Sequence, residues 1–359
     1  MATPTRTAPP DPHRAGAWLS AHVPDSRPPY AYEIVANGRS NLTYIVRDAG
    51  GALLVLRRPP AGPALPTAHD VLREHRLITA LAPTAVPVPE PVAACDDPSV
   101  LGAPFYVMRH VPGRVVTRQA DAEAWFDAPT RATLSTALVQ AMAALHAVDV
   151  DAVGLGDLAR RDRYVERQLK RWHGQLARSV APADRTDAGV AWLAEAHDRL
   201  AAAIPPQTGT ALVHGDFRLG NCVVGDDGTV RAVLDWETCT IGDPLADLAI
   251  LLVGWFEAGD DDVLGMIGDG LAPTVAPGFL DRRAVTAAYG AARDDADLAD
   301  LPYYQAFAWW RMACVLHAVR ARYASGGGGG ETAGQERMLD RARGATEQAR
   351  RALRAAGLR

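Results

Sequence analysis

Residues 212–224 read LVHGDFRLGNCVV, a polar segment between two apolar runs. A turn signal, GDDG, follows at 225–228, and a second apolar run at 230–234 ends in Asp235. Apolar runs bounded by Gly and Asp are typical of short strands joined by a turn. Two strand ends joined in this way can place Asp216 and Asp235 on the same side of a cleft.

These residue types at this spacing are suited to phosphoryl transfer. An aspartate can accept the proton of an attacking hydroxyl, while an asparagine and a second aspartate hold Mg²⁺ on the phosphates. Asp216 and Asn221 keep the spacing of the kinase loop HRDxxxxN, and Asp235 takes the place of the DFG aspartate, with Gly215 and Trp236 as departures. Ordinary turns also use Asp, Asn and Gly, but this combination at fixed spacing favours the catalytic interpretation.

The departures match a known variant. The loop resembles HGDxxxxN of the aminoglycoside phosphotransferase family, also called the choline-kinase-like family, whose metal-binding aspartate lies in a DW or DF pair. The run GDPLADLA at 242–249 is also similar to that family. The resemblance extends over residues 23–323. It implies an α+β, protein-kinase-like bilobal fold that uses ATP (or GTP) and Mg²⁺ to phosphorylate a hydroxyl of a small molecule.

The resemblance also implies a role for each residue of the loop. Asp216 would position and deprotonate the acceptor hydroxyl, and Asn221 and Asp235 would hold the metal. Arg218 lies where protein kinases keep a cation that neutralises the transferred phosphoryl group, although a surface salt bridge is an equal alternative. We expect His214 to orient the loop by hydrogen bonding and not to act as a base.

The segment before this loop has the element order of a kinase small lobe. Strands are predicted at 33–35, 42–46, 52–57, 92–95 and 105–108, and a helix at 70–81. Other α+β domains share this β-β-β-α-β-β order, so the order alone does not decide the fold.

Two features of the small lobe are candidates for contacting phosphates. The turn NGRSN before the second strand offers backbone N–H groups, with Ser40 and Asn41 capping the phosphates, although a plain hairpin turn is equally consistent. Kinases carry a lysine on the third strand, but the only lysine here is Lys170, and Arg57 occupies the matching place with Glu74 as its helix partner. An arginine keeps the charge but is larger, and a solvated strand-end arginine is the alternative.

The runs SNLTY and VLR around these positions resemble one branch of the family in particular. In that branch the kinase-like domain is fused to acyl-CoA dehydrogenases. This branch implies a hydroxyacyl thioester or a related hydroxylated metabolite as acceptor. An antibiotic, either an aminoglycoside or a macrolide, is the next candidate. Acidic clusters at 260–262 and 294–295 could serve a polycationic aminoglycoside, although such clusters are usually solvated loops.

The chain divides at a short connector. We expect a disordered tail at 1–13, a small lobe at 14–108, a hinge at 109–113 and a helical lobe at 114–359. The hinge backbone would read adenine, with Met108 against the ring, although a purely structural Met108 is equally consistent.

Long helical patterns dominate the rest of the chain. Helices are predicted at 125–148, 160–178, 188–204, 245–255, 282–289, 301–323 and 331–356. Asp243 is expected to cap a helix and Asp247 to serve as a scaffold residue. Five aromatic residues of one helix are expected to form lobe core, with an acceptor-pocket wall as the alternative: Tyr303, Tyr304, Phe307, Trp309 and Trp310.

Composition excludes several classes of protein. The net charge of −5 over 359 residues argues against a nucleic-acid partner, and four cysteines without a CxxC motif argue against a zinc site or a disulfide framework. The N-terminus lacks the apolar region of a signal peptide, and the longest apolar run is too short to span a bilayer, so we expect no membrane association and a cytoplasmic location. The sequence carries no indication of oligomeric state. Because the strand lysine is missing, a nucleotide-binding pseudokinase module is an alternative to an enzyme.

Overall fold

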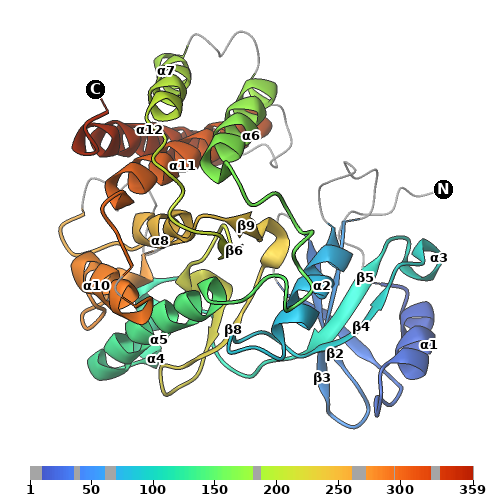
Figure 1. Ribbon diagram of the computed structural model, residues 1–359. Helices are drawn as coiled ribbons and strands as arrows, with labels where there is room; N and C mark the ends of the chain where they lie inside the picture. The colour runs from blue at the N-terminus through green and yellow to red at the C-terminus, as the bar shows by residue number, and fades with distance from the viewer. Residues whose placement is uncertain are drawn as a thin grey trace.

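A small antiparallel sheet lies beside a larger, mainly helical part of the chain, as Figure 1 shows. The computed structural model describes residues 10–35, 41–60, 70–180, 187–260, 272–294, 296–324 and 332–358. The two parts correspond to the predicted small and helical lobes, so the predicted α+β bilobal architecture is confirmed.

The small lobe is built on five antiparallel strands in the order β1-β2-β3-β5-β4. The strands are β1 (Ala31–Ile34), β2 (Leu42–Arg47), β3 (Leu53–Arg58), β4 (Pro91–Cys95) and β5 (Phe105–Arg109). Successive side chains of a strand point to opposite faces of the sheet. Leu54 and Leu56 therefore pack in one cluster with helix α1 (Pro12–His22), while Val55 joins the main core that contains helix α2 (Val71–Leu81).

Helix α2 carries one acidic residue on its buried face. Its buried positions are Val71, Glu74, Leu77, Ile78 and Leu81, the i, i+3, i+4 spacing of a helix packed on a core. The Asp70 carboxylate caps the helix by accepting the Arg73 N–H at 3.0 Å. Glu74 is therefore fixed inside the small lobe by the apolar residues of its own helix.

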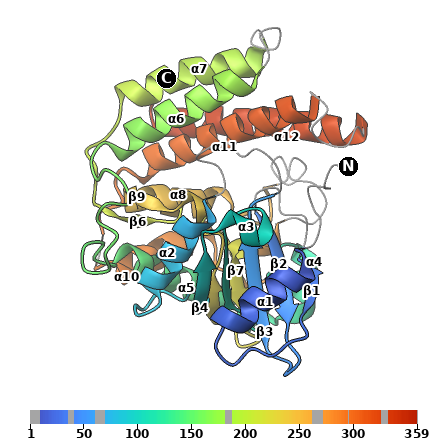
Figure 2. The same ribbon diagram turned by 90° about the vertical axis from the view of Figure 1, so that its right-hand side faces the viewer.

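The large lobe is mainly helical. Its helices are α4 (Gln119–Trp125), α5 (Ala128–His146), α6 (Tyr164–Ser179), α7 (Ala188–Ala202), α8 (Pro244–Val253), α10 (Arg282–Ala292), α11 (Leu301–Ala324) and α12 (Thr332–Ala355). Figure 2 shows α6, α7, α11 and α12 stacked above α8. Two small antiparallel sheets hold the candidate site: β6 (Ala211–Val213) pairs with β9 (Thr240–Gly242), and β7 (Cys222–Val224) forms a hairpin with β8 (Val230–Val233).

Three differences from the predicted elements have local causes. Helix α1 begins at Pro12, inside the tail expected to be disordered over 1–13, because Asp11 caps it by accepting the N–H of His13 at 2.9 Å. The helix predicted over 125–148 begins at Ala128, because Asp127 caps it and a proline lies in its first turn, while the preceding α4 was not predicted. Strand β9 and the short helix α3 (Pro98–Leu101) were not predicted.

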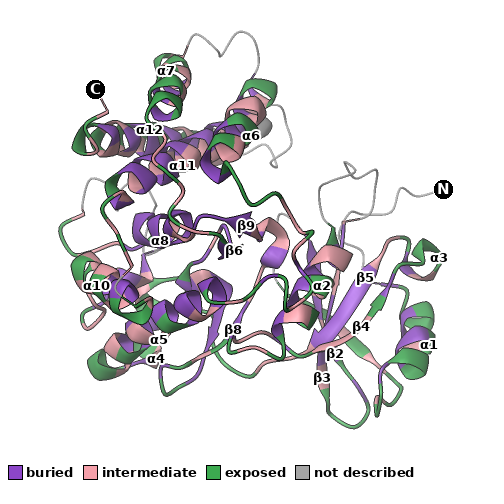
Figure 3. Cartoon of the chain, viewed as in Figure 1, coloured by how far each residue is buried: buried purple, intermediate pink, exposed green. Residues whose placement is uncertain are grey.

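Helix α8, which follows β9, is almost completely buried. Eight of its residues are buried, and Figure 3 shows α8 coloured as buried along most of its length. One of the eight is Asp247, a carboxylate inside an otherwise apolar helix. A buried carboxylate is costly unless hydrogen bonds satisfy it, so its partners indicate its purpose. Among the described residues, no helix is long and apolar enough to cross a membrane.

Candidate active site

The structure brings three predicted site residues into one hydrogen-bonded group. The Asn221 Nδ2 donates to the Asp216 backbone oxygen at 2.8 Å and to the Asp216 Oδ2 at 2.9 Å. The Arg218 Nε lies 3.3 Å from the same Oδ2. Arg218 thus forms the salt bridge of the alternative interpretation, but its partner is the carboxylate of Asp216, the residue predicted to act as the base.

Gly215 explains why the arginine of protein kinases is absent from this loop. Its φ is +80°, and a Cβ there would lie 3.0 Å from the Thr238 Oγ1 and 3.1 Å from the Thr238 backbone oxygen. The Thr238 hydroxyl donates to the His214 backbone oxygen at 2.8 Å. Only glycine adopts this conformation readily and leaves room for that contact.

His214 connects the loop to the second acidic strand. Its Nδ1 accepts the Asp216 N–H at 3.3 Å, and its Nε2 lies 2.9 Å from the Leu234 backbone oxygen. This pattern assigns the ring proton to Nε2, which donates to that oxygen. The imidazole is therefore fully occupied in holding two backbone segments, as expected for an orienting residue.

The carboxylate of Asp247, on helix α8, binds the backbone of the same loop. Its Oδ1 accepts the Gly215 N–H at 2.7 Å and its Oδ2 accepts the His214 N–H at 2.5 Å. Its Oδ2 also lies 3.4 Å from the His146 Nε2, while the His146 Nδ1 lies 2.7 Å from the Tyr289 hydroxyl. Burial opposes ionisation, but the His146 hydrogen bond and charge, the nearby His214 and the Gly215 N–H keep the pKa of Asp247 below its usual value. The predicted scaffold role of Asp247 agrees with these contacts.

We predict that Asp247→Ala destabilises the protein by roughly 2–4 kcal/mol, because two buried N–H groups of the loop lose a charged acceptor. Urea unfolding of the purified variant measures this loss. Asp226→Ala is the control, since Asp226 forms an exposed pair with Arg114 that contributes about 0–1 kcal/mol. Equal midpoints for both variants would contradict the assigned role of Asp247.

The two predicted metal ligands lie on adjoining strand ends. The Leu234 N–H donates to the Asn221 backbone oxygen at 2.8 Å, which sets Asp235 beside Asn221. Asp235 has the left-handed backbone conformation, with φ 67° and ψ 59°. Because the Asn221 Nδ2 donates to Asp216, its Oδ1 is left as an acceptor. One carboxylate and one amide oxygen fit Mg²⁺, which keeps waters and takes phosphate oxygens as further ligands.

Arg57 faces the site from the small lobe. Its Nη2 lies 3.3 Å from the Glu74 Oε2 and 3.1 Å from the Asp235 Oδ1, and its side chain is only 11% exposed. The Tyr106 hydroxyl, on the strand paired with β3, donates to the same Glu74 oxygen at 3.2 Å. The solvated strand-end alternative for Arg57 is therefore wrong, and the predicted pair with Glu74 is present.

Asn41 is placed differently from the prediction. It is 3% exposed, and its Nδ2 donates to the Glu74 Oε1 at 2.6 Å. The expectation that its side chain caps phosphates is corrected, because the buried Glu74 carboxylate draws the amide inward. Ser40 lies outside the described residues. Met108 is buried in the main core opposite Val55, as its structural alternative predicts, and contact with adenine stays a prediction.

Glu74 is placed where it resists ionisation. Burial raises its pKa, the Arg57 charge and the Tyr106 hydroxyl lower it, and the carboxylates of Asp235 and Glu237 raise it, for a pKa of about 7. The usual value is 4.5, so the folded protein holds the Glu74 proton more tightly than the unfolded chain does. The contribution of this proton to the free energy of unfolding is complete below about pH 4.5 and is lost as the pH rises through 7.

We predict that the nucleotide-free protein loses stability relative to Glu74→Gln between pH 5 and about pH 8, because only the wild type must ionise this buried group. Urea midpoints of both proteins at several pH values test this. Glu123→Gln, an exposed substitution, should follow the wild type. A wild-type advantage that grows with pH would show that Glu74 is ionised throughout.

Two arginines of the site were not predicted. Arg73 donates to the backbone oxygens of Glu237, at 3.4 Å, and of Cys239, and so ties α2 to the segment after Asp235. Arg311 of α11 donates to the Gly215 backbone oxygen at 2.7 Å. Their partners are main-chain oxygens far away in sequence, so no local pattern could identify them.

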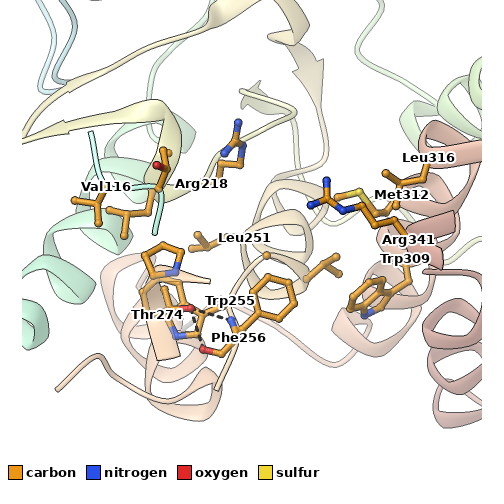
Figure 4. Close-up of a pocket in the computed structure, with 16 residues that line it drawn as sticks. Val116, Arg218, Leu251, Trp255, Phe256, Thr274, Trp309, Met312, Leu316 and Arg341 are labelled. Atoms are coloured by element: carbon orange, nitrogen blue, oxygen red, sulfur yellow. Dashed lines mark hydrogen bonds between the residues drawn. The ribbon is translucent and has the colours of Figure 1, made fainter. Parts of the chain in front are cut away.

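A pocket opens beside the loop. Figure 4 shows Arg218 and Val116 at one side and Trp309, Met312, Leu316 and Arg341 at the other. Its volume is about 240 Å³, and none of its described lining residues is acidic. The lining is mainly apolar and aromatic: Val116, Thr117, Arg218, Leu219, Gly220, Leu251, Val253, Gly254, Trp255, Phe256, Pro273, Thr274, Trp309, Met312, Leu316 and Arg341.

The predicted aromatic run of α11 divides between two environments. Tyr303, Tyr304, Phe307 and Trp310 are buried in the core, whereas Trp309 lines the pocket. The core interpretation thus holds for most of the run. Trp309 lines a pocket, and that this pocket receives the acceptor stays a prediction.

Comparison with known proteins places this geometry among phosphotransferases. The profile of the phosphotransferase enzyme family matches residues 31–285. Acyl-CoA dehydrogenase family member 10 of Mus musculus is 33% identical over 311 residues, which cover 84% of this chain but 27% of that protein. A structure from Ralstonia eutropha, provisionally described as an aminoglycoside phosphotransferase, is 30% identical with a TM-score of 0.79, covering 97% of this chain and 99% of that one. An amicoumacin kinase in complex with AMP-PNP, Ca²⁺ and its substrate shares the fold at 19% identity, with a TM-score of 0.58 and coverage of 94% and 93%.

Proposed function

The chain belongs to the phosphotransferase enzyme family, and we propose that it transfers the γ-phosphoryl group of ATP, with GTP as the alternative donor, to a hydroxyl of a small metabolite. The resemblance to kinase-like domains of acyl-CoA dehydrogenase family members and the kinase-like fold are confirmed. The observation that carries the proposal is the convergence of Asp216, Asn221, Asp235 and Arg57 on one site. A pseudokinase module would not need all of these groups.

The residues of the loop divide the reaction between them. The acceptor oxygen attacks the γ-phosphorus while the bond from that phosphorus to the β,γ-bridging oxygen breaks and the nucleoside diphosphate leaves. The proton of the acceptor hydroxyl passes to the Asp216 carboxylate. Asn221 fixes that carboxylate through its Nδ2, and Arg218 offsets negative charge on the transferred group. Arg57 faces the phosphates from the small lobe.

Mg²⁺ is the proposed metal, with Asn221 and Asp235 as its protein ligands. When bound, the ion neutralises charge on the phosphate oxygens. The complex of the amicoumacin kinase with AMP-PNP and Ca²⁺ supports the use of a nucleoside triphosphate and a divalent cation in this fold.

We predict that Asp216→Asn lowers kcat at least 10³-fold, because an amide cannot accept the hydroxyl proton. Nucleotide affinity should change less than about threefold, since the proposed phosphate and metal groups remain. Phosphate transfer is followed by mass spectrometry in an acceptor screen, and nucleotide binding by calorimetry. Equal turnover in both proteins would remove Asp216 as the base. Nucleotide binding by the wild type without transfer to any acceptor would favour the pseudokinase alternative.

We propose a hydroxyacyl thioester as the acceptor. The pocket beside Arg218 is apolar and aromatic, which suits an acyl chain and does not suit a polycationic aminoglycoside. Of the acidic clusters considered for such an antibiotic, Asp260 is paired with Arg282 and takes no part in the pocket lining, while Asp261, Asp262 and Asp295 lie outside the described residues.

We predict that Trp309→Ala raises KM for a hydroxyacyl thioester about tenfold and leaves KM for ATP unchanged, because the chain loses about 1–2 kcal/mol of apolar contact. Steady-state kinetics over a series of chain lengths measures this, and the effect should grow with length. Trp192→Ala, a tryptophan of α7 that stacks under Arg350, is the control. Transfer to an aminoglycoside and to no hydroxyacyl thioester would reject this acceptor.

A further inference from the structure

Four arginines, at positions 73, 167, 171 and 311, gather around the backbone of Gly215 and of residues 237–241. Arg73 binds the backbone oxygens on either side of Thr238, and Arg311 binds the backbone oxygen of Gly215, which packs against the same Thr238. Arg311 and Arg171 both lie on the Trp172 indole, with Cζ 4.7 and 5.2 Å from the ring centroid. Figure 1 shows α2 beside the segment that leads to β9, and α6 packed along α11.

The fourth member, Arg167, stands one helical turn before Arg171 on α6, so the two share a face of that helix. Its Nη2 donates to the Arg160 backbone oxygen at 2.6 Å and reaches the Ile241 backbone oxygen at 3.5 Å. Its Nη1 is buried without a hydrogen-bond partner among the described residues. Such an orphan donor is unusual in a folded protein and marks a position where an acceptor is missing.

Burial lowers the pKa of Arg167, and the nearby charge of Asp162, which is paired with Arg160, raises it. Within the described part of the chain, none of these guanidinium groups forms an ion pair with a carboxylate: Arg73, Arg167, Arg171 and Arg311. Partial desolvation and the charges of Arg311 and Arg73 lower the pKa of Arg171, as expected for cations held close together. A protein of net charge −5 therefore gathers four guanidinium groups, none of them in an ion pair among the described residues, beside the loop around Gly215.

We propose that the arginines 73, 167, 171 and 311 form a binding site for the phosphate groups of the acceptor. The cluster adjoins Gly215, the residue before the proposed base, while the apolar pocket begins at Arg218, two residues after it. An acceptor with an apolar chain on one side of its hydroxyl and phosphates on the other matches this arrangement. Arginine suits phosphate because its planar fork donates two parallel hydrogen bonds. The inference rests on the proposed function and narrows the thioester to a phosphate-bearing carrier such as coenzyme A.

Arg171 is the residue to test, because it is exposed and holds no backbone segment, whereas Arg73 and Arg311 support the loops of the site. The probe is coenzyme A itself, titrated by calorimetry into protein saturated with Mg²⁺ and AMP-PNP so that the nucleotide site is occupied. We expect Arg171→Gln to weaken coenzyme A binding about tenfold, and Arg171→Glu about 100-fold, because the latter replaces attraction by repulsion. Arg178→Gln, an exposed arginine two turns further along α6, is the matched control and should bind like the wild type.

Kinetics supply the second arm. A hydroxyacyl-coenzyme A and the same acyl group on N-acetylcysteamine, which lacks phosphates, are compared as acceptors. Arg171→Gln should raise KM about tenfold for the first and leave the second unchanged, with kcat within twofold for both, because the contact lies away from the reacting atoms.

The outcomes separate this inference from the proposed function. Coenzyme A binding that is absent, or unaffected by both Arg171 substitutions, overturns the arginine site even if thioesters are phosphorylated. Binding that depends on Arg171, without phosphorylation of any hydroxyacyl thioester, supports the arginine site and rejects the acceptor class.

Discussion

The catalytic loop depends on one buried carboxylate. Asp247 lies in an apolar helix and accepts the N–H groups of His214 and Gly215, the two residues before Asp216. A fully buried charge is tolerated only when it is hydrogen-bonded, so the loop and α8 stabilise one another. Because His214 also holds the strand end before Asp235, the same carboxylate fixes the relative positions of the proposed base, Asp216, and the proposed metal ligand, Asp235. The geometry of the site thus follows from satisfying a single buried group.

The small lobe meets this frame through an arginine. Arg57 of β3 lies between Glu74 of α2 and Asp235, which follows β8. One guanidinium therefore links the small lobe to the strand end that carries Asp235. A guanidinium is planar and forked, and it can engage two carboxylates while keeping further donors for phosphate. Replacement of the usual lysine therefore preserves the charge and adds a direct contact to Asp235. Arg73 adds a second link, because it binds the backbone beyond that aspartate from the adjacent position on α2.

Features that depend on neighbouring residues in the chain could be predicted from the sequence, and features that depend on contacts between distant residues could not. The loop from His214 to Asn221 and the strands around Arg57 are contiguous patterns, and both are placed as predicted. Strand β9 forms only because β6 is available to pair with it, so a three-residue stretch gave no signal. Asn41 turns inward because Glu74 lies across the small lobe, a contact between residues 33 positions apart. The contacts of Arg73 and Arg311 with main-chain oxygens likewise exist only in the folded chain.

The distribution of charge around Asp216 also bears on specificity. An apolar lining excludes polycations by offering them no counter-charge, and the four arginines nearby, which form no ion pair among the described residues, repel them further. The same arginines would attract an anionic acceptor. Its phosphate groups would also neutralise the repulsion between the guanidinium groups that the free protein bears. Binding energy gained at those phosphates, away from the hydroxyl, can be used to hold the hydroxyl against Asp216. In the proposed arrangement, the short segment that joins Gly215 to Arg218 would couple recognition of the carrier to orientation of the reacting hydroxyl.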